Sequence, residues 1–394
     1  MNAVVVLKPN REQSLLRFHP WVFSGAIARI DGQPAEGDVV AVRTAQGDVL
    51  AHGHFHSGSI TVRVLQFGEK PLNAEFWRMR LEAALRRRQQ QGLCANDGTN
   101  AFRLVHGEAD GLPGLVVDVY AQTAVIQCHT VGMYRIREQL AQLLMELPES
   151  PIAAVYDKSS GTMPMRERYN PVDGPLVGNA LPSDMVQENG CKFNVAWEGG
   201  QKTGFFIDQR ENRELLRRYA SGQTVLNTFC YTGGFSVYAL AGGATRVVSV
   251  DTSAKAVEIA AQNVAINFGN NAPHEAVAMD TFEYLRTHPE PFDIIVLDPP
   301  AFAKHGDALR NALQAYKRLN LAALRCLRPG GLLFTFSCSQ VVDKQNFRNA
   351  VFSACAIAQR DARILHQLTQ PADHPISIYH PEGEYLKGLV LQVE

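Results

Sequence analysis

Long apolar runs are absent from this sequence of 394 residues. Its first stretch, Met1–Leu7, is apolar only until Lys8-Pro9, which is too short for the core of a signal peptide. No later run approaches the ~18 residues that a membrane-spanning helix needs. We therefore expect a cytosolic protein that has no membrane partner.

Paired cysteines are also absent. The chain has seven cysteines, an odd number, and none stands in a C-x-x-C pair, so neither a disulfide framework nor a thiolate zinc site is indicated. His52, His54 and His56 alternate and would share one face of a strand, which leaves a metal site open as an alternative. Because no acidic partner for these rings is visible in the sequence, we predict no metal.

A surplus of positive charge is missing as well. The formal net charge is −1, which excludes a protein that coats nucleic acid by charge alone. Residues 1–100 nevertheless carry 12 Lys and Arg against 9 Asp and Glu. This mild excess fits a local RNA contact about as well as it fits a solvated helix face around Arg86-Arg87-Arg88.

What the sequence contains is three segments of different pattern, which agrees with the number of domains expected at this length. Short β-rich runs broken by Gly and Asp predict a small barrel over residues 1–72. Residues 73–182 begin with a helix over 74–91, and then mix strands with a helix, which indicates an α+β domain. The apolar face of the first helix would consist of Phe76, Met79, Leu81, Ala84 and Leu85. Residues 183–394 open with a hairpin and then alternate strands and helices, which predicts a doubly wound parallel sheet and an α/β fold class.

Two strand ends near the C-terminus carry the residues with the most chemistry. The expected strand Phe292–Leu297 runs into Asp298-Pro299-Pro300, and a later strand ends in Ser337-Cys338-Ser339. Ligands of an open parallel sheet bind outside the carboxyl ends of its strands, so both tips should face one site. A cysteine at a strand end is more often a small buried side chain, but at this position Cys338 could act as a nucleophile.

The first strand of the C-terminal segment leads into a glycine-bearing turn, Asn227–Ser236. Gly233 would let the backbone come close to a ligand, and Ser236 could cap the helix that follows. Bulky Phe229 and Tyr231 stand where the G-x-G-x-x-G fingerprint needs small residues. A cofactor without a pyrophosphate is therefore favoured over a dinucleotide.

Acidic residues follow the next two strands. Asp251 could accept hydrogen bonds from ribose hydroxyls, and Asp280 could accept one from the amino group of an adenine. Each residue alone is more typical of a helix N-cap. Two acids at successive strand tips, next to this turn, indicate an adenosine site.

With these motifs the chain resembles the class I S-adenosylmethionine-dependent methyltransferases. More closely, it resembles the bacterial large-subunit ribosomal RNA cytosine-C5 methyltransferase I family. The matching motifs are 200–210, Asn227–Ser236, Asp298–Phe302, Thr335–Ser339, 372–375 and Tyr385–Gly388. The resemblance covers essentially the whole length and implies an N-terminal PUA domain, a central α+β domain and a C-terminal Rossmann-like catalytic domain.

The resemblance also implies roles for individual residues. The catalytic residues would be Cys338, as the nucleophile, and Asp298. The residues placed around S-adenosylmethionine would be Phe206, Gln209, Phe229, Tyr231, Thr232, Gly233, Asp251 at the ribose, Asp280 at the adenine and Asp298 at the cofactor amine or the target base.

The implied chemistry requires a thiolate, because carbon 5 of cytosine becomes nucleophilic only after an addition to carbon 6. A free thiol with a pKa near 8.5 is a thiolate only in small part at pH 7. Many cytosine-C5 RNA methyltransferases carry a second cysteine after the Asp-Pro motif, but this chain has Pro299-Pro300-Ala301 there. The way in which the product leaves Cys338 is thus open.

We predict S-adenosylmethionine-dependent methylation of carbon 5 of a cytosine in large-subunit (23S) ribosomal RNA, with the PUA-like barrel holding the RNA. One alternative is methylation of a ring or exocyclic nitrogen, since amino-group methylases place an aromatic residue directly after Pro-Pro and Phe302 stands one residue later. Another is a non-catalytic RNA-binding assembly protein that keeps the fold. A homodimer is left open.

Overall fold

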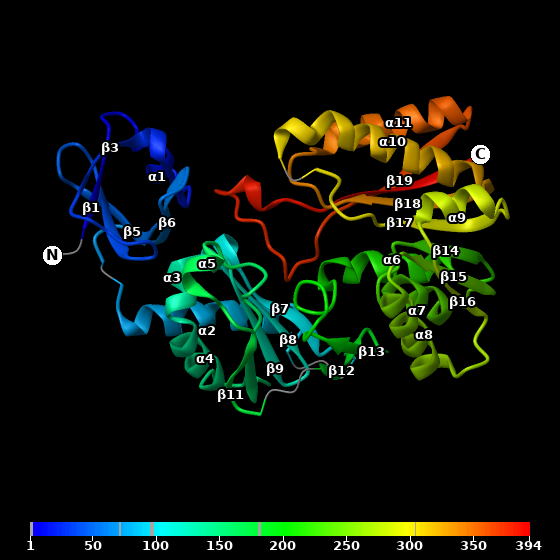
Figure 1. Cartoon of the computed structure of the whole chain (residues 1–394), viewed down its shortest axis with the longest axis horizontal. Coiled ribbons are helices and arrows are strands. Elements are labelled where there is room, and N and C mark those ends of the chain that lie inside the picture. Colours follow the sequence, from blue (N-terminus) through cyan, green and yellow to red (C-terminus); the bar gives the residue numbers. More distant parts are fainter. Residues whose placement is uncertain (1–2, 71, 95–97, 180–182, 304) are drawn as a thin grey trace. The chain divides into compact units, whose positions relative to one another are not determined.

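The computed structural model describes residues 3–70, 72–94, 98–179, 183–303 and 305–394 (Figure 1). The chain divides into two compact units. Unit 1 comprises Met1–Val186, Val195–Ile207 and Ala372–Gly383, and unit 2 comprises Gln187–Asn194, Asp208–Pro371 and Glu384–Glu394. The predicted barrel and central domain both fall within unit 1, and the boundaries at residues 72 and 182 stay predictions.

The N-terminal part of unit 1 is a six-stranded sheet of order β2-β6-β5-β4-β1-β3, with one short helix, α1 (Gln13–Leu16). Its strands are β1 (Val4–Leu7), β2 (Trp21–Phe23), β3 (Ile27–Asp31), β4 (Val39–Arg43), β5 (Val49–Phe55) and β6 (Ile60–Phe67). Val40 and Val42 alternate with more exposed residues along β4 and pack against Val62 inside the sheet. This period of two places the buried valines on one face of the sheet.

The central part of unit 1 is a five-stranded sheet of order β11-β10-β9-β8-β7. It contains β7 (Ala101–His106), β8 (Leu115–Tyr120), β9 (Thr123–Cys128), β10 (Ala154–Asp157), β11 (Gly174–Val177) and the helices α2 (Ala74–Gln90), α3 (Val131–Arg135), α4 (Arg137–Met145) and α5 (Arg166–Tyr169). The predicted helix over 74–91 is therefore confirmed as α2. Its predicted apolar face was wrong at Met79, whose side chain is exposed.

A hairpin follows, formed by β12 (Ser183–Glu188) and β13 (Cys191–Ala196). Its two-residue turn is Asn189-Gly190, with φ of 49° and 80°. Both residues take the left-handed conformation that a tight type I′ hairpin turn requires, and Asn-Gly is the pair that adopts it most readily. The sequence signal for a hairpin here is confirmed.

Unit 2 is built on a seven-stranded sheet of order β16-β15-β14-β17-β18-β20-β19. Its strands are β14 (Thr224–Thr228), β15 (Arg246–Asp251), β16 (His274–Ala278), β17 (Phe292–Leu297), β18 (Leu327–Ser337), β19 (Ala362–Leu368) and β20 (Lys387–Val393). The first five are parallel, as predicted, but β20 runs antiparallel to both β18 and β19. The strand order reverses between β14 and β17, and the carboxyl ends of these strands are where ligands of such sheets bind.

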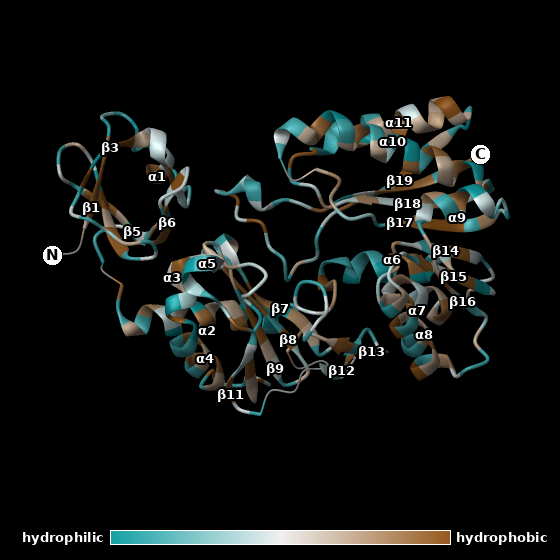
Figure 2. Ribbon diagram, in the orientation of Figure 1, coloured by the Kyte–Doolittle hydropathy of each residue, from teal (hydrophilic) through white to brown (hydrophobic). Residues whose placement is uncertain are grey.

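Helices cover both faces of this sheet (Figure 1). One layer contains α6 (Arg210–Tyr219), α7 (Gly234–Ala241) and α8 (Ala254–Phe268), and the other contains α9 (Thr281–Thr287), α10 (Leu309–Arg325) and α11 (Lys344–Ala358). Leu226, Ile295 and Leu333 are fully buried between the layers, and Figure 2 shows hydrophobic residues along these strands. Within the described ranges, none of the helices combines the length and apolarity needed to cross a bilayer.

Candidate active site

The turn after β14 has an unusual backbone. Phe229 and Tyr231 have φ of 52° and 47°, a left-handed conformation that is rare for aromatic residues. The turn is fixed to the next strand, because the amide of Cys230 donates to the carbonyl of Val250 at 3.0 Å. Such strained positions are typical of ligand-binding turns.

Gly233 closes this turn and begins α7, with a φ of 80°. A Cβ atom at this position would stand 2.8 Å from the Cβ of Ala260 on α8, so only glycine fits. The carbonyl of the neighbouring Thr232 accepts a hydrogen bond from Asn263 on the same helix, at 2.9 Å. The turn therefore lies tightly against α8.

Ser236 does not cap α7, and that prediction was wrong. The residue lies inside the helix, where its hydroxyl group bonds with Asn227 at 2.8 Å and with Ser249 at 2.6 Å. The cap position belongs to Gly233, three residues earlier, and no side chain caps it. Ser236 thus links β14 to β15 through buried polar contacts.

Asp251 stands at the tip of β15, half-buried, where the sequence placed it. Its Oδ2 accepts a hydrogen bond from the amide of Tyr231 at 3.0 Å, and its Oδ1 accepts one from the amide of Ser253 at 2.9 Å. Each carboxylate oxygen can accept a second bond, so these contacts orient the group and still allow it to bind hydroxyls.

Asp280 stands at the neighbouring tip, after β16, and is exposed. Its Oδ1 accepts a hydrogen bond from the amide of Glu283 at 3.0 Å, so the residue caps α9. The two tips are joined, because the amide of Met279 donates to the carbonyl of Asp251 at 2.9 Å. The cap is now observed, and the contact of Asp280 with an adenine stays a prediction.

Gln209 and Phe206 come from the 200–210 motif. Gln209 is buried at the start of α6, and its Oε1 accepts a hydrogen bond from Asn212 at 2.6 Å. Phe206 belongs to unit 1, where the ammonium group of Lys202 lies 4.5 Å from its ring centroid. The placement of both residues beside the cofactor stays a prediction.

The tips of β17 and β18 meet, as the sequence predicted. Leu297 pairs with Thr335 in parallel register, so Asp298 and Cys338 follow neighbouring strand ends. The Sγ atom of Cys338 lies 3.9 Å from the carbonyl oxygen of Pro299. Asp298 and Cys338 are both half-buried, so neither side chain is sealed within the core.

The other six cysteines are poor candidates for a nucleophile. Five of these are buried, and Cys94 is half-buried. Burial raises the pKa of all six thiols, including Cys94 to about 11, which keeps them neutral and unreactive at pH 7. Cys338 is therefore the best candidate for a nucleophile.

Buried hydrogen bonds hold both neighbours of Cys338. The hydroxyl group of Ser337 donates to that of Tyr316 at 2.9 Å, and the hydroxyl group of Ser339 donates to the carbonyl of Ala303 at 2.6 Å. Burial raises the pKa of Tyr316 to about 12, so this phenol stays protonated near neutral pH. The loop thus fixes the backbone and presents the cysteine between two anchored serines.

Sequence reasoning missed a buried ion pair beside this sheet. Glu188 is fully buried, and the guanidinium group of Arg213 donates to its two oxygens at 2.6 and 2.8 Å. Tyr238 donates to the same carboxylate at 3.0 Å. The three residues join β12, α6 and α7, and nothing in their spacing along the chain predicts that they meet.

The three alternating histidines lie in unit 1. The ring of His54 stacks on Trp77, and burial lowers the pKa of His54 to about 3. The Nδ1 atom of His56 lies 3.0 Å from Glu36, an acidic neighbour that the sequence did not reveal. In the part of the chain that the structure describes, no three His, Cys, Asp or Glu side chains gather so as to hold a metal ion.

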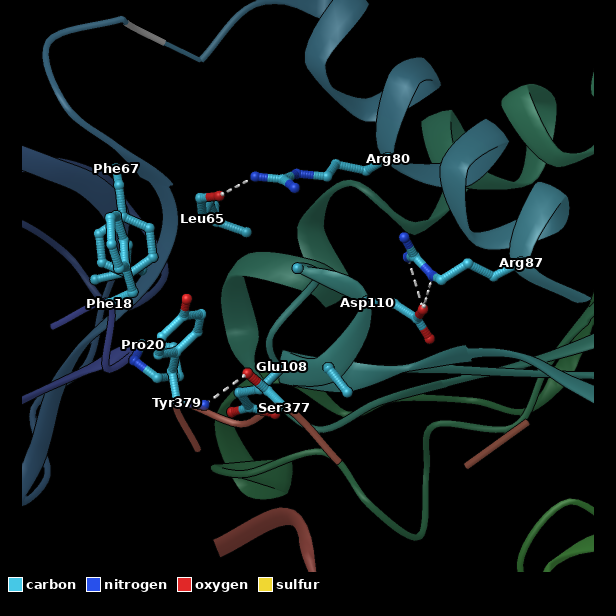
Figure 3. A pocket seen from close by; sticks show the side chains of 13 residues that line it. Phe18, Pro20, Leu65, Phe67, Arg80, Arg87, Glu108, Asp110, Ser377 and Tyr379 are labelled. Carbon is cyan, nitrogen blue, oxygen red and sulfur yellow. Dashed lines mark hydrogen bonds and ion pairs between the residues drawn. The ribbon is translucent and has the colours of Figure 1, made fainter. Parts of the chain in front are cut away.

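Unit 1 also has a recess of about 260 Å³ (Figure 3). The ring of Phe18 lies 5.4 Å from the rings of Phe67 and Tyr379, and about half of the Phe18 and Tyr379 side chains is exposed. Arg80 and Arg87 line the same recess. Exposed aromatic faces next to guanidinium groups are typical of surfaces that bind single-stranded nucleic acid.

The strand order of unit 2 and the turn Asn227–Ser236 after β14 define the class of the protein. A family model for S-adenosylmethionine-dependent methyltransferases matches residues 102–375, and a PUA-like domain matches residues 5–67. The cofactor is therefore S-adenosylmethionine. The site fits it, because Gly233 allows a close approach and Asp251 offers a fixed carboxylate at the adjacent tip.

The chain belongs to the ribosomal RNA large subunit methyltransferase I family. Members from Aeromonas hydrophila and Citrobacter koseri are 42% and 40% identical to it, and each alignment covers all of both chains. Among solved structures, a methyltransferase from Streptococcus mutans has a TM-score of 0.84 at 24% identity over the full length of both chains. Another methyltransferase structure, complexed with SAH, has a TM-score of 0.85 at 24% identity, also over both full chains. These two structures support the fold.

Proposed function

We propose that this protein transfers a methyl group from S-adenosylmethionine to carbon 5 of a cytosine in large-subunit ribosomal RNA, with Cys338 as the covalent nucleophile. The observation that carries this proposal is the position of Cys338, half-buried at the tip of β18 and 3.9 Å from the carbonyl of Pro299. The names of the relatives support ribosomal RNA as the substrate.

The residues at the cofactor half of the proposed site bind and orient. Asp251 accepts hydrogen bonds from ribose hydroxyls with the orientation that the Tyr231 and Ser253 amides impose. The turn from Phe229 to Gly233 supplies the wall beside the adenosine, and Asp280 accepts a bond from the adenine amino group. When bound, S-adenosylmethionine supplies a sulfonium-bound methyl group and leaves as a neutral thioether.

The residues at the nucleophile half carry the covalent step. The Cys338 thiolate forms a bond to carbon 6 of the cytosine, and the electrons of the 5,6 double bond move to carbon 5, which takes the methyl group. Loss of the carbon-5 proton to a base and departure of sulfur from carbon 6 restore the double bond and the thiolate. Asp298 holds the edge of the base while this happens.

Nitrogen methylation is the rival activity, and it would use an aromatic residue after Pro-Pro to stack on the base. Phe302 is the aromatic residue in question here. Its ring lies 4.7 Å from that of Tyr316 and packs on the core of unit 2. Part of this half-buried ring is therefore engaged in the core, and the trapping experiment described below separates the two activities.

The PUA-like barrel holds the RNA through the recess between Phe18, Phe67 and Tyr379. Stacking of a base on an aromatic ring contributes about 1–3 kcal/mol. Phe18→Ala should therefore weaken binding of a ribosomal RNA fragment about tenfold and leave S-adenosylmethionine affinity unchanged. Phe352→Ala, at an exposed phenylalanine on α11, is the matched control. Equal losses in the two variants would contradict a role for the recess.

The proposed activity is tested by trapping the covalent intermediate. The enzyme is incubated with S-adenosylmethionine and ribosomal RNA that contains 5-fluorocytosine, because fluorine cannot leave carbon 5 as a proton does. We expect an RNA adduct that survives denaturing electrophoresis and maps to the peptide of Cys338. With ordinary RNA, mass spectrometry should locate the new methyl group on carbon 5. A methylated nitrogen without an adduct would establish the rival activity, and bound RNA without any methylation would indicate an assembly protein.

A further inference from the structure

A buried lysine lies behind the loop that carries Cys338. Lys387 is the first residue of β20, pairs with Ser337 across the sheet, and is only 6% exposed. Its ammonium group donates to the carbonyl oxygens of Ser339 and Val342, both at 2.6 Å. The cation therefore closes the loop immediately after the cysteine.

Burying this ammonium group carries a cost that a neutral donor would avoid. A charged group removed from water is destabilising unless partners compensate it, and two carbonyl groups compensate only two of its three donors. Burial lowers the pKa of Lys387. The charges of Cys338, Glu384 and Asp343 oppose that change, and the charge of Lys344 adds to it. The cation is thus electrostatically linked to the cysteine as well as to the loop.

Among the described residues, the carbonyl of Pro299 and the carboxylate of Asp298 act against a thiolate at Cys338. The carbonyl of Pro299 accepts from the thiol at 3.9 Å and so favours the neutral form. Cys338 and the carboxylate of Asp298 both raise the pKa of the nearby Tyr316, which shows that these groups share one electrostatic environment. A positive charge behind the loop offsets them.

We propose that Lys387 is a positioning residue for Cys338: its ammonium group fixes the loop through two carbonyl groups and favours the thiolate form of the cysteine. This inference rests on the proposed function only in that it takes Cys338 to be the nucleophile. A lysine on an antiparallel strand thereby serves the chemistry at the tip of a parallel one.

The test measures the reactivity of Cys338 directly. Full-length protein is treated with iodoacetamide between pH 6 and pH 10, and the alkylation rate of the Cys338 peptide is followed by mass spectrometry. Lys387→Met removes both charge and donors, whereas Lys387→Gln keeps a donor without the charge. We expect both variants to raise the apparent pKa of the Cys338 thiol by about one unit, which makes alkylation at pH 7 about tenfold slower.

Lys387→Arg retains the charge, so the pH midpoint of Cys338 alkylation should return at least in part to the wild-type value. Cys94 is half-buried in unit 1, and its slow alkylation at pH 10 provides an internal reference rate that should not change. If Lys387→Gln has the wild-type midpoint of Cys338 alkylation, Lys387 acts only as a hydrogen-bond donor and the proposal is overturned. Should the variants fail to fold, the wild type alone decides, since a Cys338 midpoint at or above the ordinary ~8.5 also overturns it.

The outcomes separate this inference from the proposed function. Methyl transfer and its position on the base are measured with the same preparations. A charge-dependent shift in Cys338 alkylation together with nitrogen methylation would retain the coupling to Lys387 and reject the carbon-5 activity. Carbon-5 methylation with a trapped adduct, but with no shift in Cys338 alkylation in any Lys387 variant, would retain the carbon-5 activity and reject the coupling to Lys387.

Discussion

At the β14–β15 half of the proposed site, backbone amides bind the carboxylate of Asp251, whereas at the β17–β18 half buried hydrogen bonds anchor the residues on either side of Cys338. Asp251 receives amide bonds from Tyr231 and Ser253. Cys338 stands between two serines that donate to Tyr316 and Ala303. The cofactor half therefore depends on backbone conformation, and the nucleophile half depends on the identity of its side chains.

The nucleophile half should give the largest effect. Cys338→Ala should lower methyl transfer by at least about a thousandfold, because no other group replaces a covalent nucleophile. Calorimetry should show S-adenosylmethionine affinity within a factor of about two of the wild type. Cys94→Ser, at the other half-buried cysteine, serves as the control. Methylation by the Ala variant at a near wild-type rate would reject the covalent mechanism.

The cofactor half should be most sensitive at Gly233. Gly233→Ala places a side chain at a φ of 80° and 2.8 Å from Ala260, so we expect the free energy of unfolding to fall by about 2–4 kcal/mol. Gly190→Ala is matched in φ but meets no atom within 4 Å, and should cost about 1 kcal/mol. Urea unfolding of both variants measures the difference. Equal losses would show that the contact with α8 adds nothing.

Asp251→Ala tests whether the amides only fix the carboxylate or prepare it for a ligand. Charge-assisted hydrogen bonds contribute ~1.5–3 kcal/mol each, so S-adenosylmethionine should bind at least tenfold more weakly. Asp251→Asn keeps one acceptor oxygen, so its affinity for S-adenosylmethionine should lie between those of the wild type and the Ala variant. Calorimetry on the folded variants gives the affinities. Unchanged binding in the Ala variant would reduce Asp251 to a structural group.

Asp280 should give the smallest effect, since it already caps α9. Asp280→Ser keeps a side chain that caps well but removes the carboxylate, so the midpoint of urea unfolding should stay the same. Loss of one hydrogen bond to the adenine should weaken cofactor binding about three- to tenfold. Equal affinity in this variant and the wild type would leave Asp280 with the cap alone.

The parts of the site that the sequence predicted are those that follow from strand order. Parallel strands bring their carboxyl ends to one edge, so the pattern of strands and helices is enough to assign Asp251, Asp298 and Cys338 to that edge. The failures come from contacts that no local pattern encodes. Lys387 lies within a matching motif, yet its role depends on β20 pairing antiparallel with β18, which the alternation of strands and helices does not predict.

Local conformation was predicted well only where one residue type dictates it. The hairpin at the start of the 183–394 segment, whose observed turn is Asn189-Gly190, and the glycine at position 233 are such cases. Ser236 was misassigned because its hydroxyl group finds buried partners inside the fold instead of the helix end. Met79 fits an apolar helical face by spacing, but its part of the helix surface stays exposed.

The membership of residues 372–383 in unit 1 bears on how the protein is made. This segment is synthesised after residues 208–371 of unit 2, yet the carboxylate of Asp373 binds the amide of Arg103, and its carbonyl binds the fully buried Arg88. At about 5–20 residues per second, the ribosome needs on the order of ten seconds or more to get from residue 186 to residue 383. Until then Arg88 lacks the carbonyl of Asp373 and Arg103 lacks its carboxylate, so unit 1 is completed only after most of unit 2 has been synthesised.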